Sequence, residues 1–211
     1  MGSIFNQDDI PLTSKIIMFL AATLLVSATF FIALFLVVDN FSYSVDQQFI
    51  VDWVKEPVKI TSLLSKKGIS ELEIDHLVDV GRILFIAKLL MYQELLLAFI
   101  FLITIMFLNK KLGIQTFRIA GIGGVGLTAI LGIFVGFFFD SAFELFHKIL
   151  FPQGNYAFPV HSYLKIALPD SLFMSMGLTI LGLALLFQIM LLMISYVIPI
   201  LMKKKKAKSA S

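Results

Sequence analysis

The chain contains 211 residues, of which 59% are hydrophobic, 15% are charged and 22 are Phe. This composition lies far outside that of a soluble domain and predicts a membrane protein. The chain contains no Cys, which excludes disulfides, thiol nucleophiles and thiolate metal sites. The net charge of +3 comes largely from the terminal KKKKAK run, which follows an apolar stretch and indicates contact with anionic membrane lipid rather than with nucleic acid.

Apolar runs long enough to cross a hydrocarbon core of roughly 30 Å occur at four places in the chain. They cover about residues 16–38, 83–108, 119–139 and 172–202. The first run is too long for the h-region of a signal peptide, so it is predicted to be a span. The predicted fold class is an all-α polytopic membrane protein, with residues 1–211 forming a single integral membrane domain.

The distribution of Lys and Arg predicts the orientation of these spans. Four spans place both termini on one side of the membrane, and Lys and Arg are far denser in segments 1–15, 109–118 and 203–211 than in 39–82 and 140–171. The positive-inside bias therefore predicts that both termini are cytoplasmic and that segments 39–82 and 140–171 are extracytoplasmic. These two segments are predicted to form a cap of short helices and loops.

Two local patterns predict helices in the first extracytoplasmic segment. Apolar residues at helical spacing predict an interfacial helix over 47–55, with Trp53 at the depth of the lipid headgroups. Ser70 and Glu73 have the S-x-x-E form of a capping box, which predicts a helix that starts at Ser70 and continues into the second span.

The third span is predicted to follow a short basic connection at 109–118. Its opening sequence GIGGVG, at 121–126, matches a G-x-G-x-x-G pattern, but no strand precedes it and the following helix is apolar, so a dinucleotide site is not supported. These glycines are instead predicted to let helices pack closely in lipid, and Gly132 and Gly136 are predicted to extend that packing.

Two E-x-x-H pairs place a carboxylate and an imidazole on neighbouring helix positions, Glu73 with His76 and Glu144 with His147. Such pairs form half of a carboxylate-bridged di-iron pattern, but the first and fourth spans lack the Glu that the other half requires. Ser141 and Glu144 repeat the capping-box form, so a structural role is predicted for both glutamates. A mononuclear metal site of His76, His147 and Asp79 is geometrically possible but has no diagnostic spacing.

Both His76 and His147 adjoin spans on the same predicted side of the membrane. An unperturbed pKa near 6.5 suits an imidazole to proton transfer, so the two together predict acid–base chemistry. Asp79 can share a helix face with His76, where its carboxylate would accept a hydrogen bond from one ring nitrogen and leave the other free as a base. The third histidine, His161, is interpreted by default as an interfacial side chain.

The residues around these histidines resemble the lipoprotein intramolecular transacylases, which are four-span membrane proteins of low-GC Gram-positive bacteria. The elements that carry the resemblance are E-x-x-H-x-x-D-V at 73–80, D-x-x-F-x-x-F-H at 140–147, F-P at 151–152, Tyr156 with Phe158 and Pro159, and L-K-I-A-L-P-D-x-L-F at 164–173. The resemblance covers about residues 70–180 well and the order of spans throughout the chain.

The resemblance implies an acyltransferase of the bacterial cell membrane without a cofactor or metal. Its substrate would be a lipoprotein with a diacylglyceryl-modified N-terminal cysteine, whose sn-2 acyl chain moves to that cysteine's own α-amino group and gives a lyso-form lipoprotein. His76 and His147 would be the catalytic pair. Tyr156 stands where the family more usually has Trp, and His161 stands where we expect a polar residue other than His. These two departures from the family pattern concern the substrate contacts more than the chemistry.

The reaction fits these residues because the ester and the amine belong to one molecule. Aligning them can exploit effective molarities of roughly 10⁵ to 10⁸ M, so no covalent nucleophile is required. We expect His76, oriented by Asp79, to accept the amine proton, and His147 to polarise the ester carbonyl or protonate the leaving oxygen. The sequence does not decide which histidine is the base and which the acid.

A further set of polar side chains is predicted to support the site or to meet polar groups of lipid and peptide, although solvated or snorkelling positions are the ordinary interpretation of such residues. They are Asp140, Glu144, Arg82 and Lys88. Two other functions stay open from the residues alone. One is a non-catalytic accessory or sensor subunit in which His76 and His147 respond to pH or contact a partner, and the other is a metal-dependent membrane hydrolase.

Overall fold

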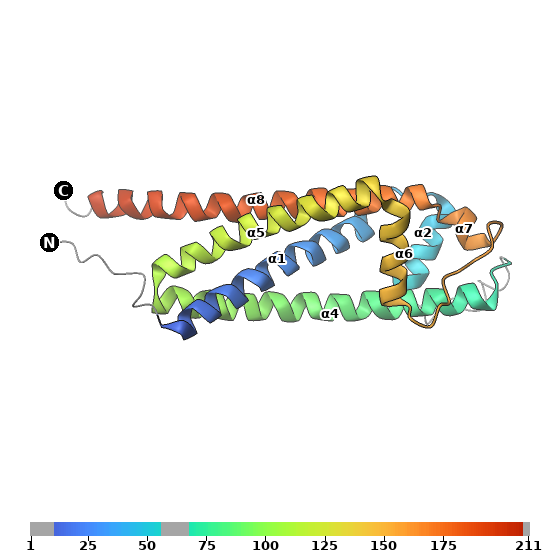
Figure 1. The fold of residues 1–211 in the computed structure, drawn as a ribbon, viewed down its shortest axis with the longest axis horizontal. Helices are drawn as coiled ribbons and strands as arrows, with labels where there is room; N and C mark the ends of the chain where they lie inside the picture. The colour runs from blue at the N-terminus through green and yellow to red at the C-terminus, as the bar shows by residue number, and fades with distance from the viewer. Residues whose placement is uncertain (1–10, 56–67, 209–211) are drawn as a thin grey trace. The chain divides into compact units, whose positions relative to one another are not determined.

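The computed structural model describes residues 11–55 and 68–208, and the regular structure within them is α-helical (Figure 1). The helices are α1 Leu12–Asn40, α2 Val45–Lys55, α4 Glu71–Leu108, α5 Lys110–Phe137, α6 Phe139–Leu150, α7 Tyr163–Ala167 and α8 Asp170–Lys208. Four of them, α1, α4, α5 and α8, are long and apolar enough to cross a membrane. The predicted all-α class and the four spans are confirmed, while residues 56–67 of the predicted cap lie outside the described residues.

The second span is part of a longer helix than its apolar run. Helix α4 has 38 residues, whereas about 20 suffice to cross a bilayer. It begins at Glu71, as the capping box predicts, and continues without interruption through the run at 83–108. Residues 71–82 therefore extend the helix beyond the length that a bilayer requires, and they include His76 and Asp79.

The predicted basic connection at 109–118 is wrong as a loop, because α5 already begins at Lys110. Only Asn109 separates α4 from α5, and its side-chain oxygen accepts hydrogen bonds from the N–H groups of Lys111 at 3.0 Å and Leu112 at 3.3 Å. Asn109 is therefore the N-cap of α5. Because Lys, Leu, Gln and Arg are good helix formers, the basic residues continue the helix once it is capped.

The described residues form two compact units. The first comprises the residues up to Phe30, Tyr92–Thr128 and those from Ala184 onward, and the second comprises Phe31–Met91 and Ala129–Leu183. Each of the four long helices contributes one part to each unit.

A buried glutamine on α8 links helices of the first unit. Gln188 has no exposed surface, its Nε2 donates to Thr29 of α1 at 3.1 Å, and its Oε1 accepts from the hydroxyl of Thr128 of α5 at 2.7 Å. A Cβ atom at Gly124 would lie only 2.7 Å from Cγ of Gln188. The glycine therefore permits the approach that lets one side chain join three helices.

The predicted close packing of glycines is confirmed in part. At Gly121 a Cβ atom would lie 2.7 Å from the Cβ of Leu192, so this position also requires glycine. The predicted extension through Gly132 and Gly136 is wrong, because a Cβ at either position would meet no described atom within 4 Å. No described neighbour therefore requires glycine at either position.

The second unit contains the short helices α2, α6 and α7 (Figure 1). Helix α2 begins two residues before the predicted start at 47 and buries Ile50, Trp53 and Val54 against Leu77 of α4 and Leu164 of α7. The predicted headgroup position of Trp53 is wrong, because its side chain is fully buried in this protein core. The apolar face of α2 covers other helices rather than lipid.

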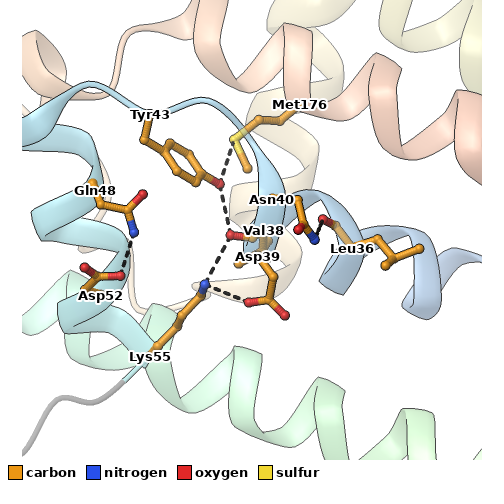
Figure 2. A network of polar contacts seen from close by, with 9 residues as sticks. All are labelled: Leu36, Val38, Asp39, Asn40, Tyr43, Gln48, Asp52, Lys55 and Met176. Carbon is orange, nitrogen blue, oxygen red and sulfur yellow. Dashed lines mark hydrogen bonds and ion pairs between the residues drawn. The ribbon is translucent and has the colours of Figure 1, made fainter.

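Polar contacts connect α2 to the end of α1, as Figure 2 shows. Lys55 forms an ion pair with Asp39 at 2.7 Å and donates to the backbone oxygen of Val38 at 3.2 Å. The hydroxyl of Tyr43 donates to the same oxygen at 3.4 Å. Burial and the charge of Asp39 raise the pKa of Tyr43 to about 12, so it remains a neutral phenol.

Candidate active site

The start of α4 is fixed by Glu73, which also holds α7. The backbone N–H of Ser70 donates to Oε2 of Glu73 at 2.8 Å, and the N–H of Glu73 contacts the hydroxyl of Ser70 at 3.4 Å, which confirms the predicted capping box. The other carboxylate oxygen, Oε1, accepts from the backbone N–H of Leu164 at 2.8 Å. One buried carboxylate therefore joins the first turn of α4 to the first turn of α7.

His76 follows Glu73 by one helical turn and is buried among aromatic rings. Its ring centroid lies 4.5 Å from that of Phe151 and 5.4 Å from that of Phe158. Its Nδ1 atom is buried without a hydrogen-bond partner among the described residues. Leaving a buried polar atom without a partner costs free energy, so this nitrogen is an exception to the usual pairing of buried polar groups.

His147 is supplied by α6, which starts differently from the prediction. The helix begins at Phe139, directly after α5, and its N-cap position is Phe138. Ser141 therefore lies inside the helix, and the predicted capping box of Ser141 and Glu144 is wrong. Glu144 is instead exposed and forms an ion pair with Lys148 at 2.6 Å.

The hydrogen bond of His147 fixes its tautomer. Nδ1 of His147 lies 2.8 Å from the backbone oxygen of Phe143. Because a carbonyl oxygen can only accept, Nδ1 carries the proton and Nε2 of the neutral ring presents a lone pair. Burial lowers the pKa of His147 below its usual 6.5, against the opposing effect of the Phe143 carbonyl. The ring is therefore a neutral base at physiological pH.

The two histidines lie together. Their ring centroids are 6.0 Å apart and the ring planes are inclined by 22°. Phe151 lies beside both rings, and the ring of Tyr156 lies 5.1 Å from that of His147. The structure thus brings together side chains from α4, α6 and the loop between α6 and α7.

Among the described residues, no hydrogen bond joins Asp79 to His76. Its Oδ2 accepts from Asn155 at 2.9 Å and from Gln153 at 2.8 Å, while Arg82 approaches Oδ1 at 3.4 Å. Burial lowers the pKa of His76 below its usual 6.5, against the opposing effects of Asn155 and of the Asp79 charge. The hydrogen bond predicted between Asp79 and a ring nitrogen of His76 is therefore not found among the described residues, and the Asp79 carboxylate is bonded to Asn155 and Gln153 instead.

Both histidines line a cavity of about 570 Å³ within the second unit. Its walls are mostly Leu, Val, Ile and Phe side chains from α1, α2, α4, α5, α6 and α8, and its polar lining also includes Tyr43 and Tyr156. Among the described residues that line it, only Lys165 and Asp170 carry a full charge, and they form an ion pair at 3.3 Å. Sequence reasoning missed both as site residues, although they stand in the L-K-I-A-L-P-D element.

The other candidates lie at the surface. Asp140, Glu144 and Arg82 are exposed and are not part of the cavity lining. Lys88 is also exposed, with its ammonium 6.0 Å from the centre of the Phe35 ring. His161 is exposed and lies outside the cavity lining, whereas Tyr156 lines the cavity as a supporting residue would.

The described residues do not group three His, Cys, Asp or Glu side chains as a metal site would require. In the possible set of His76, His147 and Asp79, the carboxylate is bound to amide side chains instead.

The fold and the site define a polytopic membrane protein with two imidazoles in the wall of an apolar cavity. The family model described as "Lipoprotein intramolecular transacylase Lit" matches residues 43–173, which is more than half of the chain. The chain belongs to this family, and it is a membrane-integral lipoprotein intramolecular transacylase. No curated protein sequence matched the chain in a separate search.

Solved structures support the same fold. The chain is similar to the membrane-integral lipoprotein intramolecular transacylase Lit from Bacillus cereus, with a TM-score of 0.68, 21% identity, and coverage of 92% of this chain and 98% of that one. Two variant structures of that protein match with TM-scores of 0.64 and 21% identity. The variant with a histidine replaced by arginine covers 93% of this chain and 95% of its own. The match to the variant with a histidine replaced by alanine covers 92% of this chain and 96% of that one.

Proposed function

We propose that the protein moves the sn-2 acyl chain of a diacylglyceryl-modified lipoprotein onto the α-amino group of the same N-terminal cysteine, with His76 and His147 as the acid–base pair. The observation that carries this proposal is the 6.0 Å separation of the two rings in the wall of one apolar cavity. At that separation both imidazoles can reach groups of a single bound ester and amine.

The hydrogen bonding favours His147 as the base, which reverses the assignment expected from the sequence. Its Nε2 lone pair accepts a proton from the amine as the amine nitrogen attacks the ester carbonyl carbon. The new C–N bond forms, the bond from that carbon to the sn-2 glyceryl oxygen breaks, and the oxygen takes up a proton from His76. His147 then passes the proton it gained to His76, which restores both rings. The amide and the free hydroxyl account for all atoms, and no water enters.

The cavity suits a lipid substrate. Its volume of about 570 Å³ falls within the roughly 300–1,000 Å³ of small-molecule sites. Aliphatic and Phe side chains would enclose an acyl chain, while the imidazoles meet the polar glyceryl-cysteine region. We further propose that both termini are cytoplasmic and that the site faces the extracytoplasmic side, because Lys and Arg concentrate at 109–118 and at the C-terminal end.

The test uses purified protein in detergent with a synthetic diacylated lipopeptide. The product is isobaric with the substrate, so mass-spectrometric fragmentation must locate the acyl group on nitrogen. We expect His76→Ala and His147→Ala to lower conversion at least about 10²-fold, the lower range of acid–base contributions. His161→Ala, at an exposed histidine, is the matched control and should keep full activity. Full activity in either cavity variant would refute the proposed pair.

A further inference from the structure

The Lys165–Asp170 ion pair is unusual because of where it lies. Lys165 and Asp170 are the Lys, Arg, Asp or Glu residues that the described cavity wall contains. Their side chains are 38% and 54% exposed, so the pair lies at the cavity surface and keeps access to solvent. A pair needed only for solubility would have no reason to lie against an acyl-chain cavity.

Helix α7, which carries Lys165, is held by neighbours on both sides. The N–H of Leu164 donates to Glu73 of α4 at 2.8 Å, and the N–H of Lys165 donates to the hydroxyl of Ser162 at 3.3 Å. At the other end, Nε2 of Gln47 of α2 donates to the backbone oxygen of Ala167 at 3.0 Å. The position of the Lys165 backbone is therefore set by contacts to α2 and α4.

We propose that Lys165 is a catalytic residue of the transacylation, whose ammonium donates a hydrogen bond to the sn-2 ester carbonyl oxygen as that oxygen becomes an anion. This inference rests on the proposed function. Attack by the amine converts the carbonyl into a tetrahedral oxyanion. The oxyanion then re-forms the C=O bond as the bond to the glyceryl oxygen breaks, and that oxygen takes up a proton. An oxyanion in an apolar cavity is costly unless a fixed donor or cation meets it.

Two of the other polar groups of the cavity do not supply this charge. His147 must be neutral to accept a proton, and Tyr43 already donates its hydroxyl to Val38. The ammonium of Lys165 acts on His147 electrostatically, since it helps to lower the pKa of that ring while Asp170 raises it. The base thus faces Lys165, Asp170, His76 and Tyr156, and the lysine favours the neutral form that the reaction needs.

The absence of Cys from the chain permits a chemical test of the charge. Lys165→Cys should lower kcat by about 10²- to 10³-fold with a smaller change in KM, as the loss of an oxyanion donor does. Alkylation with 2-bromoethylamine adds an aminoethyl group that restores a side chain of lysine length and charge, and we expect it to restore most of the activity. Methylthiolation adds an uncharged group and should not.

Lys148→Cys is the matched control, because Lys148 is an exposed lysine of α6 outside the cavity lining, and no step of either treatment should change its activity. Undiminished activity of Lys165→Cys, or equal rescue by the neutral reagent, would overturn the role of Lys165 and leave the histidine mechanism standing. A failure of aminoethylation to rescue would also overturn it. A wild-type protein that leaves the lipopeptide unchanged would instead refute the proposed function itself.

Discussion

Replacement of Glu73 tests whether one buried carboxylate supports both the start of α4 and the position of α7. Glu73→Ala leaves the buried N–H of Leu164 without its acceptor, which costs about 1–3 kcal/mol. It also removes the capping contacts with Ser70, worth roughly 1 kcal/mol. The expected loss of about 2–4 kcal/mol corresponds to a fall in Tm of roughly 5–15 °C for a chain of this size.

Glu71→Ala is the matched control, because Glu71 lies in the same first turn, carries the same charge and is exposed. Unfolding of both variants in detergent would be followed by circular dichroism, and transacylation would be measured well below either Tm. We expect Glu73→Ala to lose activity even where it is folded, because α7 carries Lys165. A Tm and an activity equal to those of Glu71→Ala would refute the argument that Glu73 positions α7.

Two further outcomes follow from the packing of α5 and from the burial of His147. Gly124→Ala should destabilise the protein by about 1–3 kcal/mol, because the added methyl group would be overpacked against Gln188. Gly123→Ala is the control and should be neutral or slightly stabilising, because a Cβ there meets no described atom within 4 Å. Equal Tm values of the two variants in thermal unfolding would contradict the packing argument. In ¹⁵N-histidine NMR, His147 should titrate below pH 6.5, because burial lowers its pKa. The stability that the neutral His147 ring contributes to the folded state is therefore present above pH 6.5 and is lost as the pH falls towards the lowered pKa. Titration above pH 6.5 would contradict the burial of His147 as a neutral base.

The features that the sequence predicted well are those set by local patterns. Long apolar runs required four spans whatever the rest of the chain did. Ser70 and Glu73 predicted the start of α4 because the capping box is complete within four residues. The proximity of His76 and His147 was predicted from their common side of the membrane and from the family resemblance, since they are distant in the sequence.

The predictions that were wrong depended on what lies next to a segment. Trp53 lies on an apolar helix face, and such a face fits lipid headgroups or a protein core equally well until α4 and α7 are known to cover it. Ser141 and Glu144 have the capping-box letters, but α5 ends immediately before α6, so the helix starts earlier than the pattern implies. For Trp53, tertiary contacts decided between two locally reasonable outcomes, and for Ser141 and Glu144 the position of the preceding helix did.

Lys165 shows why a charged catalytic group escapes sequence reasoning in such a protein. An i,i+5 Lys and Asp near a helix start is ordinarily a solvated ion pair of little energetic consequence. Its proposed significance comes from its place in the cavity wall, where the ammonium can meet a negative charge that forms on a bound substrate. In the proposed reaction the neutral base and the cation lie on different side chains, because a single imidazole cannot be both at the same moment. The fold provides them on α6 and α7, and Glu73 sets the position of α7 from the first turn of the helix that carries His76.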